Sequence, residues 1–378
     1  MAELRLDPGT TIALPKTAFS MLLENLQNLG YETEGPIVKD NAITYGPLIR
    51  VEDLPRGYTS EQEAGKYRLL NAGHSNYFDV TPGPHSWKQY FFPPRSMVAT
   101  MRLQEVNPRR WVIEEKNAES KAYALIGVRP CELAAILVQD RVFLREDLKD
   151  PIYRARRQGT FILTVNCLHP CGTCFCSSMG TGPEATSGFD LSLTELDDTF
   201  LVTVGSESGR MVLSNLPCQP ASAFLIQASR RGFAEARAHM GRNLLSPEEL
   251  PEILLNNLEH PQFEDAARRC LSCTNCTQVC PTCFCWDIQE INSLSGNFVK
   301  RERVWDSCFN PEYSYVFGGN TRPSTRSRYR QWITHKLASW WQQFGVSGCV
   351  GCGRCITWCP AGIDITAEAN AILKEVQS

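Results

Sequence analysis

The sequence CLSCTNCTQVCP at residues 270–281 and a second copy, CVGCGRCITWCP at residues 349–360, govern how the C-terminal third of this chain is built. Both copies have the form C-x2-C-x2-C-x3-C-P. Three thiolates at positions i, i+3 and i+6 allow one loop to wrap one face of an iron–sulfur cube, while the fourth lies beyond the loop, where the chain turns into a helix. The following proline ends the loop because its ring fixes φ. The repeat therefore predicts a pair of [4Fe-4S] clusters.

The same cysteine spacing occurs in bacterial two-cluster ferredoxins, in which the fourth cysteine of each run binds the other cluster. Zinc is the alternative, but zinc sites usually present two C-x2-C pairs on separate arms. Here three evenly spaced cysteines precede Cys-Pro in both copies. We assign the ligands by the ferredoxin exchange, although the long insert between the copies can alter their packing. The predicted ligands are Cys270, Cys273, Cys276 and Cys359 for cluster one, and Cys349, Cys352, Cys355 and Cys280 for cluster two.

Two further cysteines follow predicted buried strands in the N-terminal half. Cys131 opens an expected helix after the strand at 122–128, and Cys167 follows the strand at 161–165. If these strands are parallel neighbours, both cysteines emerge at the same carboxyl edge, where open α/β sheets bind ligands. Two more cysteines come shortly afterwards in the string GTCFC. The alternative is that all four are small buried core residues. The candidate third [4Fe-4S] site consists of Cys131, Cys167, Cys174 and Cys176.

The chain has 17 cysteines, so several remain without a predicted role. A disulfide framework is typical of small secreted domains, whereas this chain is long and shows no export signal. The string CPTCFC at residues 280–285 nearly repeats GTCFC. The cysteines left over are Cys171, Cys218, Cys283, Cys285 and Cys308.

Length and composition set further limits. The chain has 378 residues, enough for two or three domains, and 43% of them are hydrophobic. A formal net charge of −3 gives no sign of a surface that binds polyanions. Residues 1–15 lack the basic start and apolar run of a signal peptide, and no apolar stretch approaches the roughly 18 residues of a spanning helix. We therefore expect a cytoplasmic protein that neither binds nucleic acid nor inserts into a membrane.

Short apolar strands that alternate with helices predict an α/β domain at residues 1–245. Residues 246–378 predict an α-helical, ferredoxin-like domain that binds two [4Fe-4S] clusters and carries an insert at 286–345. We expect the first helix of this second domain to begin at Ser246, which is followed by proline and two acidic residues.

Two local patterns give further expectations. The apolar segments at 199–204 and 210–213 predict a β-hairpin around the glycine-containing stretch between them. The basic run RPSTRSRYR at 322–330 is interpreted as a solvated turn and helix start. The alternative hypothesis is that its arginines form an edge for docking a partner.

Nucleotide-binding and hydrolytic signatures are missing from the sequence. No G-x-G-x-x-G follows a predicted strand, no G-x4-G-K-[ST] exists, and the six histidines are scattered. We therefore predict no catalytic residues and no flavin site, and interpret the chain as an electron carrier. The competing class is an enzyme with its own cysteine-ligated cluster active site in the N-terminal domain.

Several longer strings resemble one family of redox subunits. They are GVRPCE at 127–132, TCFCSSMGTGP at 173–183, CPTCFC at 280–285, WDSC at 305–308, SRYRQWITHKL at 327–337 and GCVGCGRCITWCPAGIDIT at 348–366. Together they resemble the beta subunit of cytoplasmic NAD(P)-reducing [NiFe] hydrogenases of the sulfhydrogenase type. The same family includes the electron-transfer subunit of anaerobic sulfite reductase.

The resemblance implies an iron–sulfur subunit of a hetero-oligomer that relays single electrons and has no independent catalytic site. Its neighbours would be the small and large subunits of a [NiFe] hydrogenase and a flavin-bearing, NAD(P)-binding gamma subunit. In sulfite reductase the terminal module would be a sirohaem subunit, and nothing in this chain separates the two. The family pattern also makes the four cysteines of the candidate third site recurrent, with Cys171 as the departure.

Overall fold

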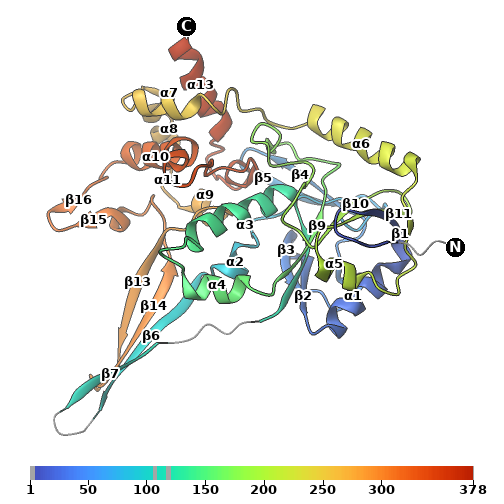
Figure 1. The fold of residues 1–378 in the computed structure, drawn as a ribbon. Helices are drawn as coiled ribbons and strands as arrows, with labels where there is room; N and C mark the ends of the chain where they lie inside the picture. The colour runs from blue at the N-terminus through green and yellow to red at the C-terminus, as the bar shows by residue number, and fades with distance from the viewer. Residues whose placement is uncertain (1–4, 105–108, 116–120, 378) are drawn as a thin grey trace.

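The computed structural model describes residues 5–104, 109–115 and 121–377. Its largest element is an eight-stranded mixed sheet with the order β12-β1-β11-β10-β9-β8-β2-β3 (Figure 1). The pairs β10–β9, β9–β8 and β8–β2 are parallel, and the other neighbours are antiparallel. The strands are β1 (Thr11–Pro15), β2 (Glu32–Lys39), β3 (Ala42–Pro47), β8 (Tyr123–Val128), β9 (Phe161–Val165), β10 (Leu191–Glu195), β11 (Thr199–Val204) and β12 (Gln219–Pro220).

Helices cover both faces of this sheet because its central strands are apolar on both sides. Ile126 and Leu163 pack with α1 in one core, while Leu125 and Ile162 pack with α3 and α4 in another. Every residue of β9 is buried, as expected for a strand between two helical layers. The predicted α/β character of the N-terminal half is confirmed. The helices of this half are α1 (Phe19–Asn28), α2 (Lys88–Phe91), α3 (Pro130–Phe143), α4 (Pro151–Arg157), α5 (Glu207–Val212) and α6 (Ala223–Ala238).

The predicted hairpin at 199–204 and 210–213 is wrong in its second strand. The first segment is β11, but the second falls in α5. The Ser206 hydroxyl accepts a hydrogen bond from the Gly209 amide at 3.1 Å and so caps this helix. β11 instead pairs with β1 and β10.

The C-terminal part is mainly helical and has its own apolar core, which includes Phe263, Trp332 and Ile356. The predicted helix start at Ser246 is wrong: this residue has φ +38°, and the first helix begins at Leu250. The helices are α7 (Leu250–Asn256), α8 (Gln262–Arg269), α9 (Asn275–Gln278), α10 (Thr325–Thr334), α11 (Trp340–Phe344), α12 (Arg354–Thr357) and α13 (Ile365–Gln377), with a π-helical turn at His335–Ser339.

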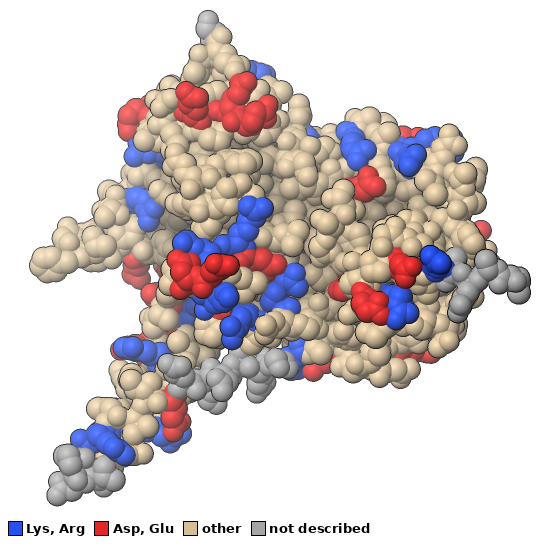
Figure 2. Space-filling model, in the orientation of Figure 1, with Lys and Arg blue, Asp and Glu red and all other residues tan. Residues whose placement is uncertain are grey.

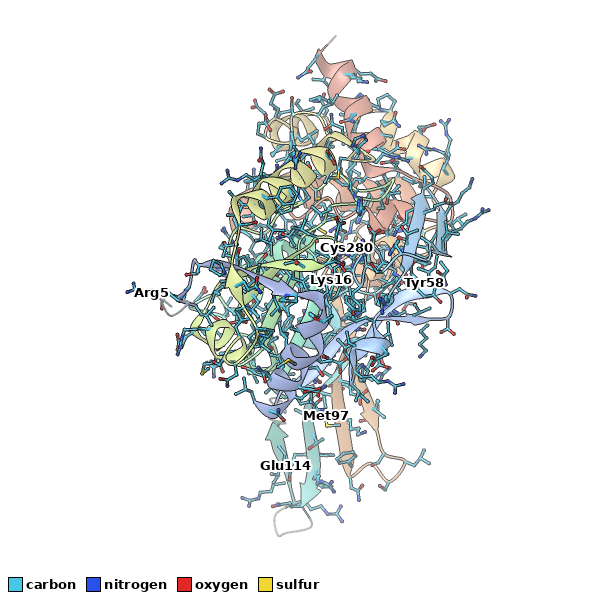
Figure 3. The ribbon with its side chains drawn as sticks, turned by 90° about the vertical axis from the view of Figure 1, so that its right-hand side faces the viewer. Arg5, Lys16, Tyr58, Met97, Glu114 and Cys280 are labelled. Carbon is cyan, nitrogen blue, oxygen red and sulfur yellow. The ribbon has the colours of Figure 1, made fainter. Side chains whose placement is uncertain are left out.

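A four-stranded antiparallel sheet projects from the body as an arm (Figure 1). Figure 3 shows Met97 and Glu114 on this arm and Cys280 inside the body. The domain division at 245/246 stays a prediction, and the arm takes two strands from each side of it. The strands, in sheet order, are β13 (Trp286–Asn292), β14 (Phe298–Trp305), β6 (Arg95–Gln104) and β7 (Arg110–Glu115).

The remaining elements are short. None of the helices in the described parts of the chain is long and apolar enough to cross a membrane. Figure 2 shows basic and acidic side chains interspersed over the visible face. The short elements are the hairpins β4 (Tyr58–Glu63) with β5 (Lys66–Asn71) and β15 (Tyr315–Val316) with β16 (Gly319–Asn320), and the 3-10 turns Lys16–Ala18, Val51–Asp53 and Pro311–Ser314.

The basic run at 322–330 is used largely within the chain. Arg328 is buried and donates to the Pro323 carbonyl at 2.8 Å. Arg326 and Arg330 both pair with the carboxylate of Glu259, at 2.6 and 2.5 Å. Arg326 and Arg328 of the hypothesised docking edge thus have partners within the chain, and the docking edge itself stays a prediction.

Candidate iron–sulfur centres

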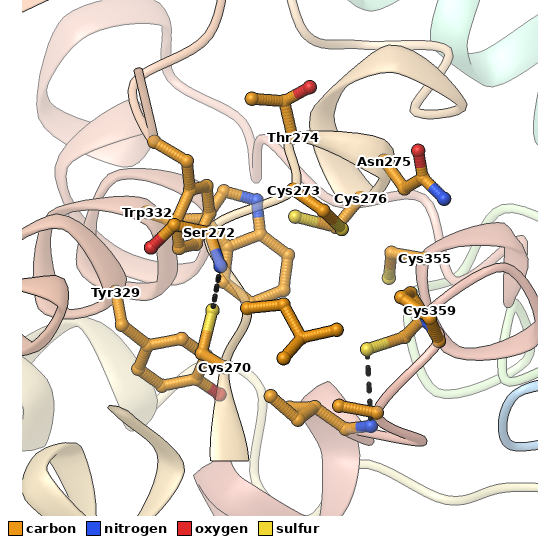
Figure 4. A pocket seen from close by; sticks show the side chains of 15 residues that line it. Cys270, Ser272, Cys273, Thr274, Asn275, Cys276, Tyr329, Trp332, Cys355 and Cys359 are labelled. Carbon is orange, nitrogen blue, oxygen red and sulfur yellow. Dashed lines mark hydrogen bonds between the residues drawn. The ribbon is translucent and has the colours of Figure 1, made fainter. Parts of the chain in front are cut away.

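The four predicted ligands of cluster one line a single pocket, which we call site one (Figure 4). Cys270 follows α8 directly and Cys276 lies in α9, whereas Cys359 comes from the second copy of the motif, just after α12. The pocket therefore combines three sulfurs of one copy with one of the other. Cys273 is exposed, so site one lies close to the surface. Its apolar wall is formed by Phe309, Tyr329, Trp332 and Ile363.

The two copies of the motif have the same backbone conformation. Ser272 and Thr274 have φ values of +50° and +68°, and Gly351 and Gly353, at the same places in the second copy, have +65° and +75°. A short helix follows in each copy, α9 in the first and α12 in the second. This left-handed pair of residues turns the loop so that successive cysteines face inward.

Backbone amides point at several of these sulfurs. The amides of Ser272 and Gly351 lie 3.4 and 3.5 Å from the sulfur of the first cysteine in their own copy. The Ile363 amide lies 3.3 Å from the sulfur of Cys359. Hydrogen bonds of this kind stabilise negatively charged thiolate clusters.

The four predicted ligands of cluster two, Cys349, Cys352, Cys355 and Cys280, form site two. Burial raises the pKa of the Cys355 thiol well above its usual value, and the other three thiols raise it further because their charges lie close. Cys355 also lines the pocket of site one. The two sites therefore adjoin.

The N-terminal cysteines gather at the carboxyl edge of the sheet, as the parallel pairing of β8 and β9 requires. The sulfurs of Cys171 and Cys174 are 2.9 Å apart, and this contact is the main cause that lowers the pKa of Cys171 to about 6. Burial raises the pKa of Cys176 to about 12, with Cys167 as the next cause. Cys171, which had no predicted role, thus lies within this N-terminal thiol group. Cys131 lies at its border, where burial and the charges of Cys176 and Cys352 raise its pKa.

The N-terminal thiol group packs directly on site two. A Cβ atom at Gly351 would lie 2.6 Å from the Cα of Cys176, and one at Gly353 would lie 2.5 Å from the carbonyl oxygen of Thr173. The Phe175 amide donates to the Gly351 carbonyl at 2.9 Å. The two glycines are needed because this segment of chain crosses the second loop, whereas the first loop carries Ser272 and Thr274 at the same places.

Two buried lysines lie beside Cys280, and neither was predicted from the sequence. The Lys336 ammonium donates to the Cys280 sulfur and to the Thr282 hydroxyl, each at 3.1 Å. Burial acts to lower the pKa of Lys336, but the neighbouring thiols raise it well above its usual value. Burial lowers the pKa of Lys88 to about 8, while the thiol of Cys283 counteracts the shift. Lys336 lies in SRYRQWITHKL, one of the strings that resemble the family, and this string was the sequence signal that could have pointed to it.

A buried ion pair joins the two halves of the chain. Arg354 in α12 contacts the carboxylate of Glu132 in α3 at 2.5 Å, and both residues are 1% exposed. The second oxygen of Glu132 accepts a hydrogen bond from the Tyr45 hydroxyl at 2.7 Å. Arg354 also donates to the Gly83 carbonyl at 3.1 Å. Because Arg354 precedes Cys355, this pair ties the second loop to the α/β sheet.

The donor set fits [4Fe-4S] clusters, which bind thiolates at four separate iron corners. Thiols surround the pocket of site one, amides point at the sulfurs, and a buried ammonium contacts Cys280. Within the described ranges, no three His, Cys, Asp or Glu side chains converge closely enough to hold a single metal ion.

Two four-cysteine loops with backbone amides directed at their sulfurs place this chain in the class of iron–sulfur proteins, and comparisons agree with this. Residues 269–363 match the family model of the 4Fe-4S dicluster domain. The chain is 32% identical over 319 residues to sulfhydrogenase 2 subunit beta of Pyrococcus furiosus, and the match covers 83% of this chain and 91% of that protein. The chain therefore belongs to the family of sulfhydrogenase beta subunits, as its motifs predicted. No solved structure matches it significantly.

Proposed function

We propose that this chain relays single electrons within a multi-subunit oxidoreductase, between a [NiFe] hydrogenase module and a flavin-bearing, NAD(P)-binding subunit. The observation that carries the proposal is a row of adjoining thiol groups. Cys131 and Cys176 both lie close to Cys352 of site two, and Cys355 of site two also lines the pocket of site one. The row ends near the surface at the exposed Cys273. Such a row suits electron transfer through the chain from one partner to another.

The proposal assigns ligands as the spacing predicts. The N-terminal thiol group is proposed to hold a third cluster, with Cys171 available beside the four predicted ligands because its sulfur contacts Cys174. The clusters supply one-electron redox chemistry when they are bound. Ligands are Cys270, Cys273, Cys276 and Cys359 in site one, Cys349, Cys352, Cys355 and Cys280 in site two, and Cys131, Cys167, Cys174 and Cys176 in the third site.

The rest of the chain has defined tasks in this proposal. Backbone amides stabilise negative charge on the sulfurs, as the Gly351 amide does for the Cys349 sulfur. Lys336 offsets the charge of the Cys280 thiolate from inside the protein. Apolar side chains such as Trp332 and Ile363 shield the inner side of site one from water, which strengthens the contact of the Ile363 amide with the Cys359 sulfur.

The first test is anaerobic purification of the chain with iron, sulfide and zinc analysis and low-temperature EPR. Two clusters correspond to about eight iron atoms per chain, and three to about twelve. Replacing Cys174 and Cys176 by serine should remove about four iron atoms if the third site exists, whereas Cys218→Ser should remove none. A colourless protein that contains zinc and no iron would refute the relay.

The second test uses the purified complex and identifies the terminal chemistry. We expect NAD(P)H to reduce the clusters of this chain only when the flavin subunit is present, and hydrogen to reduce them only when a nickel-containing subunit is present. Sirohaem in place of nickel would assign the complex to the sulfite reductase branch. Turnover of substrate by the isolated chain would instead favour an enzyme with its own cluster active site.

A further inference from the structure

A second group of thiols lies outside the sites described so far. It consists of Cys283, Cys285 and Cys308, which we call the arm-root thiols because they lie where β13 leaves and β14 returns to the body. β13 begins directly after Cys285, and β14 ends at Trp305, shortly before Cys308. Cross-strand pairing of Trp286 with Trp305 therefore brings the two cysteines together although 22 residues separate them in the sequence. The Asp306 amide donates to the Cys285 carbonyl at 2.9 Å, and the Cys285 and Cys308 side chains are in contact.

The chain around Cys283 repeats the local structure of the N-terminal thiol group. In CGTCFC, residues 171–176, the Thr173 hydroxyl lies 3.3 Å from the Cys171 sulfur. In CPTCFC, residues 280–285, the Thr282 hydroxyl lies 3.2 Å from the Cys280 sulfur. Both threonines are fully buried. Each string also brings its first two cysteines into contact, so the two strings share this local arrangement, and each carries a third cysteine two residues further on.

Charge provides an independent argument. Lys88 and Lys336 are 3% and 4% exposed, and in the described structure neither ammonium forms an ion pair with a carboxylate. Lys336 contacts Cys280, a hydroxyl and a carbonyl, and Lys88 contacts a carbonyl at 3.4 Å and lies 3.8 Å from the ring of Trp305. Burying an ammonium is costly unless a negative charge compensates it. Lys336 already offsets the charge of Cys280 in site two, whereas the thiol that acts most on Lys88 is Cys283. The buried Lys88 ammonium therefore favours a bound thiolate over a neutral thiol in the arm-root group.

We propose that Cys283, Cys285 and Cys308 bind a further [4Fe-4S] cluster at the root of the arm. Three thiolates hold three iron corners, and the fourth corner takes a ligand from outside this group; the Tyr313 hydroxyl lies beside Cys285. Cys280 contacts Cys283, so the new site adjoins site two. The proposal extends the relay, because it adds a branch that runs from site two to the base of the arm.

The test compares iron, sulfide and zinc in the full chain with those in Cys285→Ser and Cys308→Ser, all prepared without air. Cys218→Ser is the matched control, since this half-buried cysteine belongs to no thiol group among the described residues. We expect each variant to lose about four iron atoms per chain and to keep the EPR signals of the other clusters, while the control keeps all its iron. Unchanged iron in both variants would overturn the proposal, and so would loss of one zinc in place of iron.

A second measurement covers variants that fail to fold. Native mass spectrometry counts clusters directly, and the variant with Cys174 and Cys176 replaced by serine removes the N-terminal site from the count. Three clusters in that variant support the arm-root site beside sites one and two, and two or fewer overturn it. Failure of the relay as a whole has a different result, because the unmodified chain would then carry no iron at all. A chain that retains iron but is unaffected by loss of the arm-root thiols refutes only this site.

Discussion

The buried pair of Glu132 and Arg354 offers the sharpest test of how the two halves of the chain depend on each other. Glu132→Gln keeps the shape of the side chain and removes its charge, which leaves the buried Arg354 guanidinium without its carboxylate and with the Cys352 thiol as the remaining acidic group beside it. Arg354 keeps its bond to the Gly83 carbonyl, but its Nη1 already has no hydrogen-bond partner among the described residues. The structure around it therefore offers no carboxylate that compensates for the lost charge at this position.

The magnitude follows from burial. Breaking one partner of a buried ion pair costs about 3–5 kcal/mol. The lower end applies here, because the amide oxygen of glutamine still accepts a hydrogen bond from Tyr45 or from Arg354 and the Cys352 thiol stays beside the guanidinium. A chain of this length loses about 2 °C of melting temperature per kcal/mol. We therefore expect Glu132→Gln to melt about 6 °C below the unmodified chain.

The assay is thermal unfolding followed by circular dichroism under anaerobic conditions. Glu207→Gln is the control, because Glu207 pairs with Arg210 on the surface and such pairs contribute little to stability. Replacing Glu132 and Arg354 together by methionine should recover part of the loss, since no unpaired charge then remains. Equal melting temperatures for Glu132→Gln and the unmodified chain would refute the reasoning.

Three further perturbations give separate outcomes. Lys336→Met removes the positive charge beside site two. We therefore expect an EPR-monitored redox titration to show one cluster potential about 60 mV more negative, which is a tenfold change in the equilibrium constant for one electron. The exposed control Lys374→Met should leave every potential unchanged. Gly351→Ala should melt several degrees lower than the control Gly180→Ala and should lose iron. Both glycines have φ +65°, but only an alanine at 351 meets backbone within 3 Å. Equal melting temperatures of the two variants would contradict the close packing. Burial lowers the pKa of His335 from 6.5 to about 4, so the unfolded chain binds a proton that the folded chain does not, and stability falls as pH drops from about 6.5 to about 4. His335→Gln should flatten this dependence in urea unfolding, and an unchanged slope would show that other groups cause it.

The spacing of the cysteines in the sequence predicted much of how they group in the structure. The C-x2-C-x2-C-x3-C-P repeat predicted that Cys359 joins the loop of Cys270, and the pocket of site one contains both. The strand at 161–165 was also predicted correctly, because a short run of apolar residues is typical of a strand covered on both faces. Such features depend on residues close together in the sequence, where spacing and covalent geometry leave few options.

Other features arise from contacts that no local pattern encodes. The roles of Lys336 and Arg354 depend on elements distant in sequence, and Cys285 meets Cys308 only because two strands of the arm pair in one register. The predicted helix start at Ser246 failed because this residue adopts φ +38°, outside the helical region, and α7 begins only at Leu250. The physical reason is that cluster ligands are spaced by the loop that carries them, whereas buried charges and thiols acquire partners only when separate segments pack together.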